Sequence, residues 1–193
     1  QKEFGLEVNP DKPIVAFCSR MNVYKGFDLI KCSIEKLINE LDIQFVGVGS
    51  GDREYEDFFR YLNGKYPGKV HISLGFSLEI GKKIYSGADI YVMPSLTEPC
   101  GLSQIIASRY GVVPIVRETG GLKDTIRDFG CLGGGNGYTF TNAVASDLEY
   151  SIRRAVADYR DPVGWAEKVR TVMTLDFSWN KTAKQYLEAY NNI

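Results

Sequence analysis

Residues 90–104 read Ile-Tyr-Val-Met-Pro-Ser-Leu-Thr-Glu-Pro-Cys-Gly-Leu-Ser-Gln, and this stretch indicates the fold. An apolar run stops at Pro94, and a helix-like pattern follows Gly101. This order predicts a buried strand, a tight turn and a helix with Leu102, Ile105, Ile106 and Arg109 at apolar-periodic positions. The N–H groups at a helix N-terminus attract phosphates. Because a carboxylate repels phosphate, Glu98 suits the hydroxyl groups of a sugar joined to that phosphate.

The same alternation of strand and helix signals extends along the chain on both sides of this stretch. Apolar runs predict strands at 14–18, 43–48, 70–74, 90–93, 114–116 and 138–140. Helical periodicity fills most of the intervals and continues to the C-terminus. Strands that alternate with helices form a parallel sheet covered on both faces, so we predict one doubly wound, Rossmann-like α/β domain over residues 1–193. Pro114 cannot donate to a sheet ladder, which predicts that it begins its strand or lies at an edge.

Composition excludes several classes of protein. The chain of 193 residues is 44% apolar and 12% aromatic, enough for a substantial core, and its net charge is −1. A balanced charge argues against a nucleic-acid or membrane-surface binder, and no apolar run has the length of a membrane span. The four cysteines form no CxxC pair and have no histidine at metal-ligand spacing, so we expect reduced thiols, no metal site and a cytoplasmic protein.

Polar and glycine-rich segments follow the predicted strands, where α/β folds bind their ligands. Arg20 and Lys25 follow the first strand, Gly49 and Gly51 the second, and Phe76 the third. The remaining segments are 98–103 and the turn 119–122. Two cations, an aromatic ring, a helix N-terminus and a carboxylate on one rim suit a nucleoside diphosphate with a group attached.

Each of these residues also has an ordinary structural interpretation. Arg20 and Lys25 could be solvated loop charges, although their place directly after a buried strand favours phosphate binding. Phe76 is more often a core residue than a base-stacking platform on sequence grounds. The single histidine, His71, lies within a strand pattern and is interpreted as a core residue. We find no nucleophile–base pair and no carboxylate cluster for Mg²⁺.

Five motifs in this order resemble the C-terminal domain of bacterial glycogen synthase and plant starch synthase. They are Ser19-Arg20 with Lys25-Gly26, residues 98–104 (Glu-Pro-Cys-Gly-Leu-Ser-Gln), residues 119–125, Gly137-Tyr138 with Phe140, and residues 176–179 (Asp-Phe-Ser-Trp). The resemblance covers about residues 13–193. It implies the C-terminal half of a GT-B fold, a retaining glucosyltransferase that uses ADP-glucose to extend the non-reducing end of an α-1,4-glucan.

The resemblance assigns roles residue by residue. Arg20 and Lys25 match the pair that neutralises the diphosphate leaving group in place of a metal ion, and Glu98 matches the acid that contacts the donor glucose. The remaining expected contacts are Phe76 against adenine, Cys100 and Gly101 along the sugar, Leu102 and Ser103 as N–H donors to phosphate, and Thr119, Gly120 and Gly121 near the sugar and distal phosphate. Family members often have tyrosine where this chain has Phe76. Many other retaining GT-B enzymes have a second glutamate at the position of Ile106, and its absence favours the glycogen and starch synthases.

The resemblance also implies front-face attack, in which the leaving phosphate accepts the proton of the acceptor. The acceptor-binding surface and a catalytic histidine belong to an N-terminal domain of the family that this chain lacks. We therefore expect the isolated chain to bind ADP weakly and to transfer no glucose. The competing hypotheses are a retaining GT-B transferase with another sugar nucleotide, such as UDP-glucose, and a non-catalytic nucleotide-binding module. A dehydrogenase is disfavoured because the third glycine and the ribose-binding acid are missing.

Overall fold

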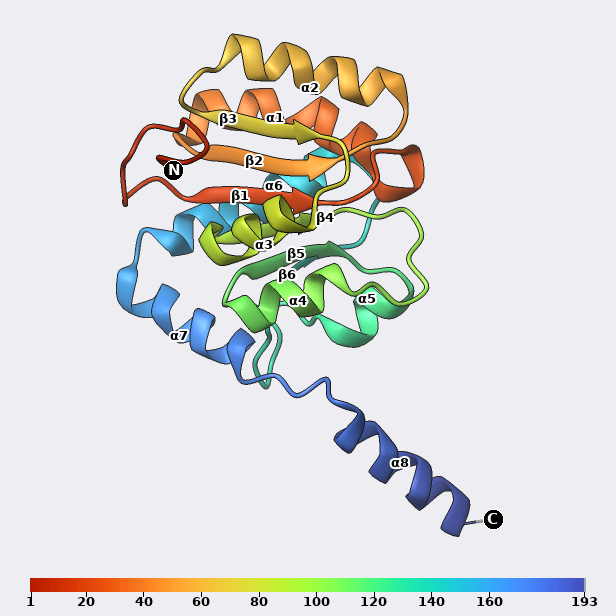
Figure 1. The fold of residues 1–193 in the computed structure, drawn as a ribbon. Coiled ribbons are helices and arrows are strands. Elements are labelled where there is room, and N and C mark those ends of the chain that lie inside the picture. Colours follow the sequence, from red (N-terminus) through yellow and green to blue (C-terminus); the bar gives the residue numbers. More distant parts are fainter. Residues whose placement is uncertain (193) are drawn as a thin grey trace.

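A six-stranded parallel sheet, in the order β3-β2-β1-β4-β5-β6, forms the centre of the computed structural model, which describes residues 1–192 (Figure 1). The strands are β1 (Ile14–Cys18), β2 (Gln44–Gly49), β3 (Val70–Leu74), β4 (Ile90–Met93), β5 (Val113–Arg117) and β6 (Tyr138–Phe140). The chain moves outward from β1 to β3, crosses back to β4 and continues to β6. The predicted doubly wound fold is confirmed, with its change of direction between β1 and β4.

Helices cover both faces of the sheet (Figure 1). One face carries α1 (Phe27–Leu41), α2 (Arg53–Lys65) and α6 (Ala145–Tyr159), and the other carries α3 (Leu78–Gly87), α4 (Ser103–Tyr110) and α5 (Gly120–Thr125). Alternate residues of β1 divide between the two cores: Val15 and Phe17 pack toward α1, whereas Ile14 and Ala16 pack toward α3. Burial on both faces explains why the strands read as continuous apolar runs.

Two further helices follow β6 and α6. Helix α7 (Pro162–Met173) packs on α4 and α6, and Asp161 caps its first turn by accepting a hydrogen bond from the Val163 N–H. Helix α8 (Trp179–Asn191) leads away from the sheet and has no buried residue (Figure 1). Its apolar side chains, Trp179, Tyr186, Leu187 and Tyr190, are exposed. No helix among the described residues is both long and apolar enough to cross a membrane.

The position of Pro114 differs from the sequence-based prediction. It is the second residue of β5, and β5 lies between β4 and β6, not at an edge. The Val113 N–H donates to the backbone carbonyl of Asp89, just before β4, so the backbone nitrogen of Pro114 faces the β6 side. Pairing with β6 begins only at Ile115, opposite Tyr138. Pro114 therefore fits in an interior strand, because the N–H that it lacks would lie just before the ladder between β5 and β6 begins.

Three other predictions need correction. The buried residues of α4 are Gln104, Ala107 and Ser108, whereas Leu102 and Ile106 of the predicted apolar-periodic set are exposed. Gly120 and Gly121 open helix α5 rather than forming a simple turn. His71 is only partly buried on the outer strand β3, where its ring stacks on Phe4 with centroids 4.6 Å apart.

Asp89 precedes β4 at the opposite, amino-terminal edge of the sheet. Its Oδ2 accepts a hydrogen bond from the Ile14 N–H at 2.8 Å. Burial nevertheless raises the pKa of Asp89 to about 6, because the charged form loses contact with water.

We expect Asp89→Asn to stabilise the chain at pH 7 by about 1–2 kcal/mol, because the amide oxygen still accepts from Ile14 without a buried charge. A folded-state pKa above the unfolded value stabilises the fold at low pH, and this contribution is lost as the pH rises from about 4 through 6. Urea unfolding at pH 4.5 and 7 measures the difference. Asp11→Asn is the control, because Asp11 is an exposed carboxylate near Asp89. An equal change in the free energy of unfolding in both variants would contradict the raised pKa of Asp89.

Candidate functional site

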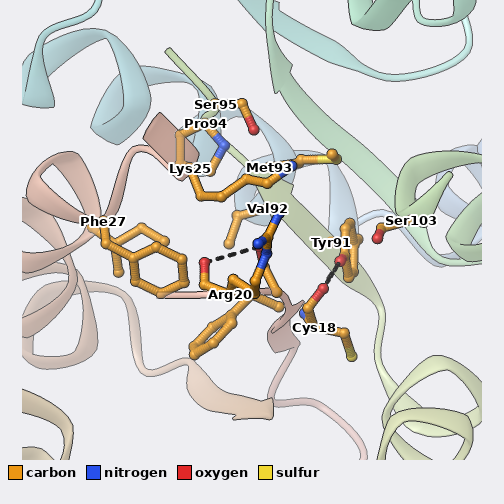
Figure 2. A pocket seen from close by; sticks show the side chains of 13 residues that line it. Cys18, Arg20, Lys25, Phe27, Tyr91, Val92, Met93, Pro94, Ser95 and Ser103 are labelled. Carbon is orange, nitrogen blue, oxygen red and sulfur yellow. Dashed lines mark hydrogen bonds between the residues drawn. The ribbon is translucent and has the colours of Figure 1, made fainter. Parts of the chain in front are cut away.

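The strands β1 and β4 separate at their carboxyl ends, where the direction of the sheet order changes. Their paired register covers only Val15 with Ile90 and Ala16 with Tyr91. Beyond it, the buried Tyr91 hydroxyl donates to the Cys18 carbonyl at 3.0 Å and accepts from the Cys18 N–H at 3.1 Å (Figure 2). The side chain thus supplies bonds that a strand would otherwise make. The opening left between the strands is the usual place for a ligand in such folds.

A cationic cavity of about 210 Å³ occupies this opening. Figure 2 shows Arg20, Lys25, Ser95 and Ser103 around it. Lys25 ends a short 3-10 helix, η1 (Val23–Lys25), and its N–H donates to the Asn22 side chain at 3.0 Å. Gly26 follows with φ +75°, and a Cβ there would lie 2.0 Å from the Pro94 carbonyl oxygen. Only glycine allows this close approach, which fixes the direction in which Lys25 leaves the backbone.

Lys25 forms an ion pair with Glu98. The Glu98 side chain is buried, with 8% of the residue exposed, and Ser95 Oγ lies 3.4 Å from its Oε2. A buried carboxylate requires such partners, because an unpaired charge inside a protein is costly. The two catalytic candidates that lie 73 residues apart in sequence are therefore in direct contact.

The backbone around Glu98 is held by the start of α5. The Gly121 N–H lies 3.1 Å from the Glu98 carbonyl and 3.2 Å from the Pro99 carbonyl. A Cβ on Gly121 would lie 2.5 Å from the Cys100 carbonyl oxygen. The two glycines at 120 and 121 thus permit backbone-to-backbone packing between α5 and the loop that carries Glu98. The sequence indicated a turn here, but not its partner.

The N-terminus of α4 lies at the same cavity. Leu102, the residue before the helix, provides no side-chain cap, and Ser103 of the first turn lines the cavity. Gln104 is fully buried, and its Nε2 donates to the Gly101 carbonyl at 2.9 Å. The uncapped first-turn N–H groups and the helix dipole favour an anion at this position.

A second cavity, of about 460 Å³, adjoins the first, and Cys18, Ser19 and Arg20 line both. Phe76 is 85% exposed here, which rules out the core interpretation of this ring. Ile106 and Tyr110, on the exposed side of α4, also line the cavity. The cavity is largely apolar and has an exposed ring on its rim, features suited to a flat heterocycle next to a phosphate group.

The structure brings most of the predicted residues to one rim, with clear differences among them. Arg20, Lys25 and Ser103 line the cationic cavity, and Phe76 lines the apolar one. The others lie in the loop and helix start next to Lys25 but line neither cavity: Glu98, Cys100, Gly101, Leu102, Thr119, Gly120 and Gly121.

Sequence reasoning missed the contributions of Ser95, Ile106 and Tyr110. Ile106 and Tyr110 were detectable only as apolar residues on a helix, a pattern that normally indicates a buried face. Cys18 also lines both cavities, and burial raises the pKa of its thiol to about 12. The thiol stays protonated at neutral pH and is therefore a poor nucleophile.

The fold and these two joined cavities define a class: a Rossmann-like domain with its ligand-sized cavities at the switch point of the sheet. The chain belongs to the glycosyl transferases group 1 family, whose family model matches residues 1–172.

Among curated proteins, the chain is similar to the glycogen synthases of Geobacillus thermodenitrificans (46% identity) and Geobacillus stearothermophilus (45%). Each match covers the whole of this chain and 40% of the relative. Among solved structures, it resembles the catalytic domain of starch synthase IV from Arabidopsis thaliana bound to ADP and acarbose, with 34% identity and a TM-score of 0.90. That match covers 99% of this chain and 40% of the other. A sucrose-phosphate synthase from Thermosynechococcus elongatus is more distant, with a TM-score of 0.67, 25% identity, and coverage of 96% of this chain and 46% of that one.

Proposed function

We propose that this chain is the donor-binding domain of an ADP-glucose:α-1,4-glucan glucosyltransferase that acts in the cytoplasm and retains the α configuration. The observation that carries the proposal is the pair of joined cavities. The apolar one offers Phe76 to a base, and the cationic one offers Arg20 and Lys25 to a diphosphate. The similarity to glycogen synthases and to a starch synthase bound to ADP supports adenine and glucan as the particular chemistry.

The proposed mechanism depends on charge. When the bond between the anomeric carbon and the diphosphate oxygen breaks, negative charge develops on the phosphate. Arg20, Lys25 and the first N–H groups of α4 stabilise that charge, since fixed donors need no rearrangement during the reaction. Glu98 positions the glucose through its hydroxyl groups. The acceptor hydroxyl attacks from the same face, and its proton passes to the departing phosphate oxygen.

The acceptor glucan would bind mainly to another part of the protein. The chain spans 40% of the length of the curated relatives that it matches. We propose that an N-terminal domain completes the site and holds the α-1,4-glucan. The 193-residue chain alone should then bind ADP but transfer no measurable glucose from ADP-glucose.

Calorimetric titration of this chain with ADP, UDP and ADP-glucose tests the function. We expect ADP to bind more tightly than UDP, and Arg20→Ala to abolish the heat of ADP binding. Tighter binding of UDP would instead support a transferase that uses another sugar nucleotide. Binding of ADP without any transfer by the complete protein would support a non-catalytic nucleotide-binding module.

Removal of the exposed Phe76 ring at the apolar cavity should weaken ADP binding without changing the stability of the fold. We expect Phe76→Ala to raise the dissociation constant for ADP about tenfold, because stacking on an aromatic ring contributes about 1–3 kcal/mol per base. The unfolding midpoint should not change, since Phe76 is 85% exposed. Tyr150→Ala, another exposed aromatic, is the control. Unchanged ADP affinity in Phe76→Ala would remove the ring from the site.

A further inference from the structure

Arg117, the last residue of β5, joins three segments of the rim. Its Nε donates to the Ser95 carbonyl at 3.0 Å, and one terminal nitrogen donates to the Leu96 carbonyl. The other terminal nitrogen donates to the Thr141 carbonyl, beyond β6, at 3.2 Å. All three nitrogens of the guanidinium are therefore used to hold backbone carbonyls.

No carboxylate neutralises Arg117 within residues 1–192. The neighbouring Glu118 instead accepts hydrogen bonds from the hydroxyls of Thr139 and Thr141. An arginine suits this arrangement because its planar, rigid fork presents donors in several directions. A lysine ammonium has one nitrogen and cannot span the same three acceptors.

Two of the three carbonyls belong to the segment that leads directly to Glu98. Ser95 is fully buried, and its hydroxyl also lies 3.4 Å from Glu98 Oε2. The same segment is tied to η1, because the Leu96 N–H donates to the Tyr24 carbonyl at 2.8 Å. Arg117 thus fixes the chain two and three residues before the carboxylate that pairs with Lys25.

We propose that Arg117 is a positioning residue for Glu98. It holds residues 95 and 96 so that the Glu98 carboxylate lies against Lys25, which lines the cationic cavity. The inference rests on the proposed role of Glu98 in the transfer reaction. Arg117 lines neither cavity, and its three nitrogens face carbonyls, so it acts through the loop and not by contact with the diphosphate.

A double-mutant cycle in the complete transferase tests this role. We expect Arg117→Lys to lower kcat about 10–100-fold, the loss that follows from a small displacement of a group at the reacting centre. KM for ADP-glucose should change less than threefold. When Glu98→Gln is already present, Arg117→Lys should lower kcat less than twofold further, because residues that act as one unit are not additive.

The same cycle can be followed by ADP binding to the 193-residue chain. Glu98→Gln releases Lys25 and should lower the dissociation constant for ADP about fivefold. In the Arg117→Lys background, the same substitution should lower it less than twofold. Arg109→Lys is the matched control, since Arg109 is an exposed arginine that donates to a single carbonyl, that of Met173. Unfolding midpoints of all variants are measured, and Arg117→Gln replaces Arg117→Lys if that variant does not fold.

Fully additive effects of the two substitutions in both cycles would overturn the proposal, as would a loss of stability with kcat unchanged. A rise in KM with kcat unchanged would mean that Arg117 binds the donor itself, which also overturns it. Failure of the wild-type transferase to use ADP-glucose would instead contradict the proposed function. The ADP-binding cycle would then still decide whether Arg117 controls the contact between Glu98 and Lys25.

Discussion

Replacement of Arg20 or Lys25 by alanine is expected to lower glucose transfer by the complete enzyme about a thousandfold. Both side chains line the cationic cavity at the end of β1, and we propose that they neutralise the leaving diphosphate. Removal of one fixed donor to a developing negative charge costs about 100- to 1,000-fold in kcat in other enzymes, and a full charge is lost here. The measurement is the initial rate of transfer from ADP-glucose to a glucan primer.

The two alanine variants should differ in ADP binding. Arg20 is exposed and makes no ion pair among the described residues, so its whole charge is available to the ligand. Lys25 must leave Glu98 before it meets a phosphate, which reduces its net contribution. We therefore expect Arg20→Ala to weaken ADP binding more than Lys25→Ala.

The matched controls for these two variants are Arg153→Ala and Lys36→Ala. Both residues form ion pairs on helices away from the cavities, with Glu40 and Glu149 respectively. Surface pairs of this kind contribute about 0–1 kcal/mol to stability, so both controls should retain full activity. Turnover within threefold of wild type in Arg20→Ala or Lys25→Ala would show that the diphosphate lies elsewhere.

Glu98→Gln should have opposite effects on ADP binding and on catalysis. The carboxylate pairs with Lys25 and, on the proposed function, would compete with the diphosphate for it. Loss of the carboxylate charge should therefore tighten ADP binding about fivefold, equivalent to about 1 kcal/mol. Transfer should fall about a hundredfold, because the bonds from a charged acceptor to sugar hydroxyls are worth about 1.5–3 kcal/mol.

Calorimetry with ADP and initial rates with ADP-glucose measure the two effects of Glu98→Gln separately. Glu118→Gln is the control, because Glu118 lies on the same rim and accepts only from threonine hydroxyls. Weaker ADP binding in Glu98→Gln would contradict the competition for Lys25. Unchanged transfer would remove Glu98 from the glucose site.

Under the proposed function, the ion pair between Lys25 and Glu98 gives each part of the donor its own partner. A donor that carries glucose offers hydroxyl groups to Glu98 and phosphate to Lys25, so each member of the ion pair gains a new partner. ADP alone offers a partner only to Lys25 and leaves the buried carboxylate without its cation. On the proposed function, we expect this difference to favour the sugar nucleotide over the product and to assist release of ADP after transfer.

Much of the fold could be predicted from the sequence because its strands are buried on both faces. A short continuous apolar run such as 14–18 is typical of a strand that is buried on both faces of a sheet. Helical connections between such strands indicate that the strands pair in parallel. The location of the site followed from the same pattern, since the loops after parallel strands meet at one edge. Arg20, Lys25 and Phe76 were found in this way.

Predictions failed where a residue's surroundings come from distant parts of the chain. The periodicity of 102–109 indicated which residues share a face of α4, but not that this face borders a cavity, while Gln104 and Ser108 are buried. Pro114 was misplaced because the start of the ladder with β6 depends on where residue 138 arrives. Both errors concern contacts between elements, which local pattern does not encode.

The sequence by itself determined the order of elements along the chain and the residue types that follow each strand, because these depend on local propensity and burial. Tertiary structure alone decided the ion pair between Lys25 and Glu98, the exposure of Phe76 and the hold of Arg117 on three carbonyls. The ion pair and the three hydrogen bonds join residues 21 or more positions apart, and the exposure of Phe76 depends on which other segments pack beside it. Local sequence pattern encodes none of these.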